Sequence, residues 1–162
     1  MCELTPNQIL FGERNYEAAL NLIISYAQNE LVIFDADFSR GGYNSLKRYE
    51  LLNQFLAKSN KNILNIVLLD ADYLMQNCPR LLGLLKNYSH LMTIYKTNQA
   101  AKIAQDCFII ADQQHVLRRF NKDQARFKFN VDDKILATQI NERFSELLAE
   151  TTEKIASYPL GL

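Results

Sequence analysis

Two short apolar runs that end in aspartate constrain the fold of this chain more than any other feature. Residues 32–37 read VIFDAD and residues 67–72 read VLLDAD, so three apolar residues precede an aspartate in each. A continuous apolar run of this length is typical of a strand that is buried on both faces, as in a parallel sheet. Between the two runs, residues 45–59 have the spacing of an amphipathic helix. This order of strand, helix and strand predicts an α/β fold.

Further helices flank these strands in the predicted order. Apolar residues at intervals of three and four predict a first helix over residues 15–29, with Asn15 as its N-cap. Pro79 fits the first turn of a helix that follows the second strand. A last helix is expected after Asp132 or Asp133, either of which is a suitable N-cap.

The second half of the chain adds several strands, at residues 92–95, 107–111, 115–120 and 126–131. In the last of these, apolar and polar residues alternate strictly, which is typical of an antiparallel strand with one wet face. No linker or low-complexity tract interrupts the pattern. Residues 1–162 are therefore expected to form one α/β domain, a mixed sheet with helices on both faces.

Composition and charge exclude several functional classes. Lysine plus arginine equals aspartate plus glutamate, 18 against 18, so we expect no nucleic-acid partner from the overall charge. No run approaches the ~20 apolar residues that span a bilayer, and the first residues lack the pattern of a signal peptide. Three scattered cysteines without a CxxC pair argue against a disulfide scaffold and a zinc site. We expect a cytoplasmic protein without a cofactor.

The order of elements resembles one half of a phospholipase D-like protein. The signature strand of that family, H-x-K-x4-D, carries a nucleophilic histidine, a phosphate-binding lysine and a closing aspartate. The matching segment reads QDCFIIAD, with Gln105 in place of the histidine and Cys107 in place of the lysine; only Asp112 matches. A glutamine amide cannot act as the nucleophile, and a cysteine supplies no positive charge. The resemblance therefore implies a degenerate active site without phosphodiesterase activity.

The chain also resembles a bacterial family to which no activity is attached. Three short segments carry this resemblance: PRL at residues 79–81, IAD at residues 110–112 and LGL at residues 160–162. Members of that family look like the domain that is sometimes fused behind a GNAT-type acetyltransferase. This implies a partner protein, for which an acetyltransferase is one candidate.

Phospholipase D-like catalytic sites are built from two halves, so the resemblance also implies a homodimer. The apolar strand at residues 107–111 and the hairpin after it would then lie near the surface that a second copy covers.

Five aspartates follow predicted strands: Asp35, Asp37, Asp70, Asp72 and Asp112. Ligands of open α/β sheets bind at the carboxyl ends of the strands, and carboxylates there could hold Mg²⁺. The commoner role of such an aspartate is to cap the following turn, and both roles stay open. Residues 31–39 also resemble the first motif of haloacid dehalogenase-like phosphatases, without a clear later acidic pair. A divergent metal-dependent phosphate-handling enzyme is therefore the alternative function.

Residues 114–129 gather positive charge around one histidine. His115 follows Asp112 closely and precedes Arg118, so the three could face one cleft, although a lone histidine is more often a surface or hydrogen-bonding residue. The alternation after Arg126 sends aromatic rings and cations to opposite faces, which favours a solvated face over a surface for single-stranded nucleic acid. The favoured function is a non-catalytic binding or interaction module for an anion or a partner protein. Its candidate ligand-binding residues are Asp35, Asp37, Asp112, His115, Arg118 and Arg126.

Overall fold

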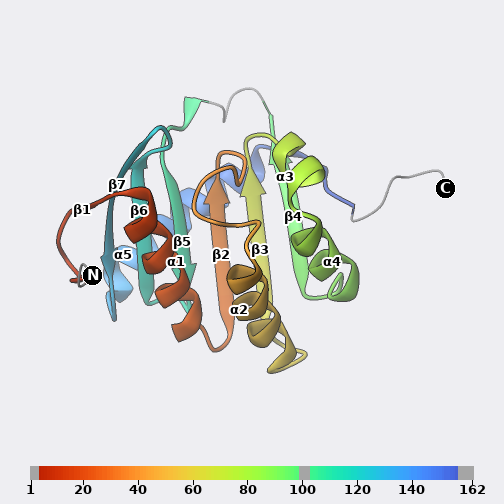
Figure 1. The fold of residues 1–162 in the computed structure, drawn as a ribbon, viewed down its shortest axis with the longest axis horizontal. Helices are drawn as coiled ribbons and strands as arrows, with labels where there is room; N and C mark the ends of the chain where they lie inside the picture. Colours follow the sequence, from red (N-terminus) through yellow and green to blue (C-terminus); the bar gives the residue numbers. More distant parts are fainter. Residues whose placement is uncertain (1–3, 99–102, 157–162) are drawn as a thin grey trace.

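A mixed eight-stranded sheet lies at the centre of the fold (Figure 1) in the computed structural model, which describes residues 4–98 and 103–156. The order of the strands across the sheet is β1-β7-β6-β5-β2-β3-β4-β8. The strands are β1 (Leu10–Phe11), β2 (Glu30–Asp35), β3 (Ile63–Leu68), β4 (Met92–Thr97), β5 (Cys107–Ala111), β6 (His115–Asn121), β7 (Gln124–Asn130) and β8 (Thr151–Lys154).

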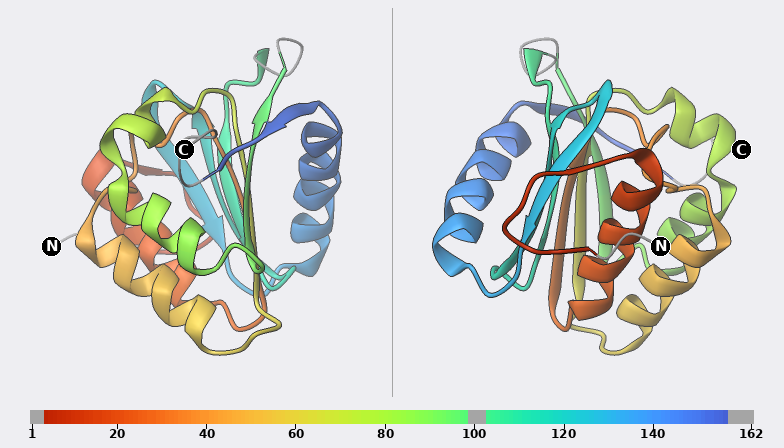
Figure 2. Two further views of the ribbon diagram at one scale, coloured as in Figure 1. Left: turned by 90° about the vertical axis from the view of Figure 1, so that its right-hand side faces the viewer. Right: turned by 60° about the vertical axis from the view of Figure 1, so that its left-hand side comes forward.

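Helices cover both faces of this sheet (Figure 2), which confirms the predicted fold class. Among the described segments, α1 to α4 lie on one face and α5 lies on the other. The helices are α1 (Glu13–Tyr26), α2 (Leu46–Ala57), α3 (Asp72–Asn77), α4 (Pro79–Asn87) and α5 (Lys134–Ala149). Within the described ranges, no helix is long and apolar enough to cross a membrane.

The two apolar runs form neighbouring parallel strands, as predicted. β2 pairs with β3, and β3 pairs with β4, all in parallel. Every residue from Leu31 to Asp35 is buried, because α1 and α2 cover one side of β2 and α5 covers the other. Alternate side chains of β2 accordingly join two separate apolar clusters: Leu31 and Ile33 pack with α1, whereas Val32 and Phe34 pack with α5.

β5 runs in the direction opposite to β2, and this fixes where its ends lie. Phe108 pairs with Phe34, and Ala111 pairs with Leu31. The start of β5 therefore lies beside the carboxyl end of β2, whereas Asp112 lies at the other edge of the sheet. The expectation that five aspartates share one edge is wrong for Asp112, because an antiparallel strand brings its carboxyl end to the opposite edge.

Both faces of β5 are covered within the chain. All five residues of the strand are buried, with Ile109 packed in the cluster under α1 and Phe108 packed under α5. The idea that a second copy must cover this strand is therefore wrong, because α1 and α5 already do so.

The structure confirms some of the helix starts predicted from the sequence and corrects others. The Ser45 hydroxyl accepts from the backbone N–H of Arg48 at 3.1 Å, so Ser45 caps α2. The Asp133 carboxylate accepts from the backbone N–H of Leu136 at 3.0 Å, which confirms Asp133 as the cap of α5. Asn15 is not a cap, because α1 begins two residues earlier, after Gly12. The sequence did not predict β1, α3 or β8, and residues 160–162 lie outside the described residues.

Candidate binding sites on the two faces of the sheet

A polar pocket lies at the carboxyl end of β2, where the start of β5 and the end of β6 meet it. We call it the β2-end pocket; its volume is about 230 Å³. Its lining residues are Tyr16, Asp35, Ala36, Asp37, Ser39, Arg40, Cys107, Arg119, Lys122 and Asp123. Cys107 pairs directly with Arg119 across β5 and β6, so these two side chains project to the same face as Asp35, under α1.

The carboxyl group of Asp35 turns inward. The side chain is buried, and its Oδ2 accepts from the backbone N–H of Phe38 at 2.7 Å and of Asp37 at 3.2 Å. These bonds hold a turn in which Phe38 has a φ of 71°. Burial raises the pKa of Asp35 to about 6, against the opposing effect of the hydrogen bonds. Asp35 therefore caps its own loop instead of presenting a free carboxylate.

Cys107 is a buried thiol beside this carboxyl group. Its exposed fraction is 3%. Burial raises the pKa of the thiol far above its usual value, and the charge of Asp35 raises it further. A reactive cysteine needs a lowered pKa and access to solvent, and Cys107 has neither.

Arg119 is the buried cation of the β2-end pocket, beside the more exposed Arg40 and Lys122, and sequence reasoning missed its role. The guanidinium is 1% exposed and donates to both carboxylate oxygens of Glu13, at 2.6 and 2.9 Å. It also lies over the ring of Tyr16, 4.9 Å from the centroid. Alternation along β6 was the available signal, because it places Arg119 on the same face as the core residue Leu117. The bidentate contact leaves Arg119 largely neutralised.

Asp112 and His115 lie at the other edge of the sheet and serve the backbone. The Asp112 carboxylate accepts from three successive N–H groups, those of residues 28, 29 and 30, at 2.8, 2.7 and 3.0 Å. Nδ1 of His115 accepts from the N–H of Asp132 at 3.1 Å. His115 and Arg118 project to opposite faces of β6, so the expectation that they share a cleft with Asp112 is wrong.

Two more of the aspartates after strands, Asp37 and Asp70, also cap turns. The Asp37 Oδ1 accepts from the N–H and the hydroxyl of Ser39, at 2.9 and 2.6 Å, and the Asp70 Oδ1 accepts from the N–H of Asp72 at 2.8 Å. Across residues 4–98 and 103–156, no group of three or more His, Cys, Asp or Glu side chains is placed to hold a metal ion.

A second site lies on the opposite face, between β6, β7 and α5, and we call it the α5 groove. Its volume is about 340 Å³. The lining residues are Ile9, Val116, Arg118, Phe120, Arg126, Lys128, Asn130, Leu136 and Ile140. Arg118 and Arg126 both lie over the ring of Phe120, at 5.7 and 5.2 Å from its centroid. The structure thus brings together two of the candidate residues in a site without a carboxylate in its lining.

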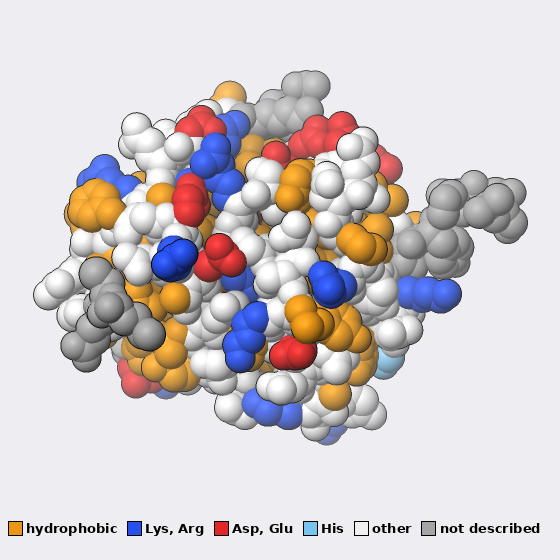
Figure 3. Space-filling view, viewed as in Figure 1, with side chains coloured by type: hydrophobic (Ala, Val, Ile, Leu, Met, Phe, Trp, Pro, Cys, Tyr) orange, Lys and Arg blue, Asp and Glu red, His pale blue; other side chains and the backbone are white. Residues whose placement is uncertain are grey.

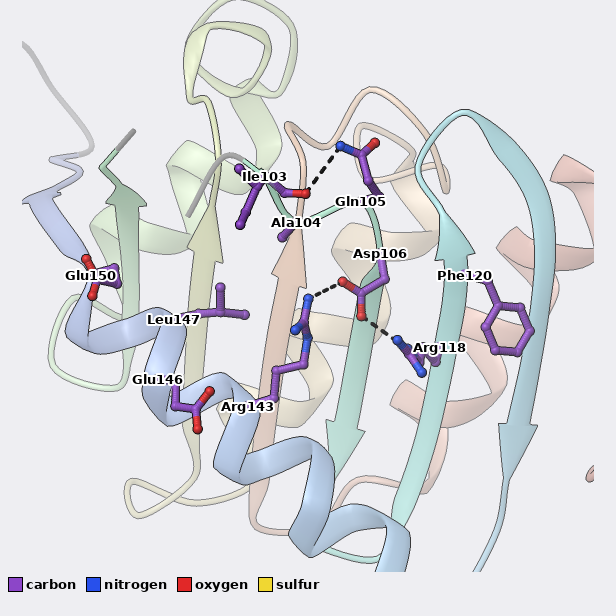
Figure 4. A pocket seen from close by; sticks show the side chains of 10 residues that line it. All are labelled: Ile103, Ala104, Gln105, Asp106, Arg118, Phe120, Arg143, Glu146, Leu147 and Glu150. Atoms are coloured by element: carbon purple, nitrogen blue, oxygen red, sulfur yellow. Dashed lines mark hydrogen bonds and ion pairs between the residues drawn. The ribbon is translucent and has the colours of Figure 1, made fainter. Parts of the chain in front are cut away.

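A cavity of about 560 Å³ adjoins this groove and shares Arg118 and Phe120 with it. Figure 4 shows that the buried carboxylate of Asp106 points toward two guanidinium groups, those of Arg118, at 3.1 Å, and Arg143. The amide of Gln105 points away from them and donates to the carbonyl of Ile103 at 3.3 Å. Asp106, Glu146 and Glu150 make the lining of this cavity partly acidic.

The face that carries α1 to α4 has a different character. Cationic and acidic side chains are interspersed over it (Figure 3). The gathering of cations without carboxylates therefore distinguishes the α5 groove.

The protein has a phospholipase D-like α/β fold. The phospholipase D family member Nuc from Salmonella typhimurium is 11% identical, with a TM-score of 0.67 over 92% of this chain and 97% of that chain. NucT from Helicobacter pylori is 13% identical, with a TM-score of 0.62 over 90% of this chain and 96% of that chain. TrmBL2, an archaeal chromatin protein with a novel mode of DNA binding, is 14% identical, with a TM-score of 0.64 over 93% of this chain and 55% of its own.

Residues 13–155 match the family described as domain of unknown function DUF7931, and the chain belongs to that family. No curated protein matches the sequence.

Proposed function

We propose that this protein is a non-catalytic binding module with a phospholipase D-like fold and a degenerate signature strand. One observation carries the proposal, namely the surroundings of Cys107 at the start of β5. Its buried thiol lies beside the buried carboxyl group of Asp35, where the resemblance places a phosphate-binding lysine. A phosphoryl group in this position would meet an acid at the place of the lysine's positive charge.

The neighbouring groups do not replace the missing catalytic parts. Gln105 is exposed at the position of the nucleophile, and an amide neither attacks phosphorus nor cycles a proton. Arg119 is the nearest buried cation, and Glu13 already occupies it through two hydrogen bonds. Stabilisation of a developing phosphoryl charge requires donors that are free to meet it.

An anion is the ligand that the charges support best. The α5 groove gathers Arg118, Arg126 and Lys128 without a carboxylate in its lining. A module of this kind is also expected to work beside a second chain, either another copy of itself or a partner such as an acetyltransferase. That expectation rests on the family resemblance, as does the expectation of a bacterial protein, whereas the expectation of a cytoplasmic protein rests on the composition.

A diester assay together with thermal unfolding tests the proposal. Hydrolysis of bis(p-nitrophenyl) phosphate should equal the blank, and inorganic phosphate or an organic anion should raise the unfolding midpoint, because a ligand that binds only the folded state stabilises it. Turnover that co-purifies with the protein and falls in Gln105→Ala would overturn the non-catalytic role. Thermal unfolding with added MgCl₂ tests the alternative function. A rise in the unfolding midpoint that Asp37→Asn abolishes would favour the metal-dependent enzyme.

A further inference from the structure

We infer that the α5 groove binds an amphipathic anion, that is, a phosphate monoester or carboxylate joined to a short apolar body. The inference deepens the proposed function and rests on it, because it names the ligand class of the binding module and the residues that hold it.

Two cations lie directly opposite each other in the wall of the groove. Arg118 on β6 pairs with Lys128 on β7. Like charges in this position repel and destabilise the strand pair. Asp106 compensates Arg118 from the neighbouring cavity. Among the described residues, its carboxylate bonds to Arg118 and Arg143 and not to Lys128. The repulsion at Lys128 therefore remains, and a bound anion would relieve it.

Arg126 adds a third cation to the same wall. Neither Arg126 nor Lys128 forms an ion pair with any residue in the described part of the chain. The ring of Phe120 attracts both guanidinium groups that lie over it. The ring thereby holds Arg118 and Arg126 at the groove before a ligand arrives, which lowers the ordering cost of binding.

The remaining surface of the groove is largely apolar. Val116 on β6 and Ile140 on α5 are buried, Leu136 on α5 is partly buried, and Ile9 is 45% exposed at the rim. Small-molecule sites commonly combine such an apolar lining with a few polar groups that fix orientation, and their volumes begin at about 300 Å³. Inorganic phosphate would meet the cations but leave the apolar surface wet. An anion with an apolar body uses both.

The two cavities described above, the β2-end pocket and the cavity beside Asp106, are less suited to this ligand. The β2-end pocket has Asp35, Asp37 and Asp123 in its lining, and the cavity beside Asp106 is partly acidic. Carboxylates in a lining repel an anion, so the balance of charge directs the ligand to the α5 groove.

Calorimetric titration with octyl phosphate, kept below its micelle concentration, tests the inference. We expect octyl phosphate to bind at least about tenfold more tightly than inorganic phosphate or the neutral octyl glucoside, because only octyl phosphate engages both surfaces. Arg126→Glu and Lys128→Glu should each weaken it by about tenfold or more. The matched control is Lys86→Glu, a charge reversal at an exposed residue of α4 on the other face of the sheet. It should leave the affinity for octyl phosphate unchanged.

A second variant separates the apolar contribution from the charge. Leu136→Ser should weaken octyl phosphate while leaving the affinity for inorganic phosphate unchanged; circular dichroism of each variant checks that it is folded. Vesicles of phosphatidylcholine with and without phosphatidylglycerol distinguish the source of the ligand. Co-sedimentation of the protein with the anionic vesicles indicates a membrane lipid. If the protein binds octyl phosphate but does not co-sediment with these vesicles, the ligand is a free small molecule.

Three results would overturn the groove as the site: no binding of octyl phosphate, equal binding of all three probes, or full binding by the folded Arg126→Glu and Lys128→Glu variants. These results leave the non-catalytic role standing. Release of inorganic phosphate from octyl phosphate during the titration would instead overturn the proposed function, so the two failures are distinguishable.

Discussion

The thiol of Cys107 and the carboxyl group of Asp35 lie side by side at the carboxyl end of β2, each almost fully buried. Desolvation favours the neutral form of both acids. The charge of Asp35 raises the pKa of the thiol further, whereas the hydrogen bond from the thiol lowers the pKa of Asp35 in part. The pair is therefore held in its protonated form more readily than either group would be in water. The carboxyl end of β2 therefore holds two buried acids and not a reactive nucleophile.

Asp35 should make stability depend on pH in a definite direction. Its folded pKa of about 6 lies above the ordinary 3.8, so its favourable contribution is complete below the unfolded value and is lost as pH rises through about 6. A difference of about two pKa units corresponds to about 3 kcal/mol. Asp35→Asn should therefore gain stability relative to the wild type between pH 4 and pH 7, by up to that amount. Urea unfolding followed by circular dichroism measures the difference.

The matched control for this experiment is Asp123→Asn, in the same pocket but exposed. Its stability difference from the wild type should not follow that of Asp35→Asn. If the difference for Asp35→Asn were constant from pH 4 to pH 7, the carboxyl group of Asp35 would not be buried in solution as the structure has it.

Asp112 should matter for stability through its three backbone hydrogen bonds. Asp112→Ala leaves the N–H groups of residues 28–30 without this acceptor, and hydrogen bonds to a charged group contribute about 1.5–3 kcal/mol. Because these groups are partly exposed and water can replace the carboxylate in part, we expect a loss of about 2 kcal/mol in the free energy of unfolding. Asp123→Ala is the comparison, and an equal loss in both variants would contradict the capping role.

The position of Asp112 also marks a limit of what the sequence could predict. The runs that end in Asp35, Asp70 and Asp112 look alike, because an apolar period identifies a buried strand and carries no information about its direction. β2 and β3 were predicted correctly as parallel strands, with one helix between them. The direction of β5 depends on the long-range pairing of Phe34 with Phe108, which no local pattern in the chain specifies.

The candidate site divides in the same way. Alternation after Arg126 predicted that Phe127 and Phe129 are buried and that the cations project to the other face, and the structure confirms it. The partner of Arg119 was out of reach, because Glu13 lies 106 positions earlier in the chain. A contact of this kind is decided by the docking of α1 on the sheet and not by spacing in the sequence.

The contact of Arg119 with Glu13 should show strong coupling. Glu13→Gln leaves a buried guanidinium without its counter-charge, and we expect a loss of about 1–3 kcal/mol, reduced from the fully buried case because Glu13 is 45% exposed. Arg119→Met keeps most of the buried volume and removes the charge. The double variant should therefore be more stable than the sum of the two single losses predicts, which a double-mutant cycle from urea unfolding measures. Additive losses would contradict the coupling.

Assembly is the last property that can be tested directly. Phospholipase D-like catalytic sites are built from two halves, so the resemblance implies a homodimer in which each copy supplies one half. The two copies would then meet at the starts of their β5 strands. Ile103 lies just before that start and is 82% exposed, so a second copy would cover a large apolar side chain there. His115 and Arg118, which belong to the hairpin after β5, do not share a face: His115 is buried at the opposite edge, and Arg118 faces α5. We therefore predict that Ile103, not His115, lies in the seam.

Sedimentation velocity at micromolar concentration should give a species of about twice the chain mass of 18.7 kDa. Ile103→Asp should shift it to the monomer, because a buried carboxylate without a partner is costly. Ile135→Asp is the matched control, since Ile135 is 77% exposed at the start of α5 and lies away from the start of β5. A wild-type chain that sediments as a monomer rules out a stable homodimer. A dimer that withstands Ile103→Asp would place its interface on another surface.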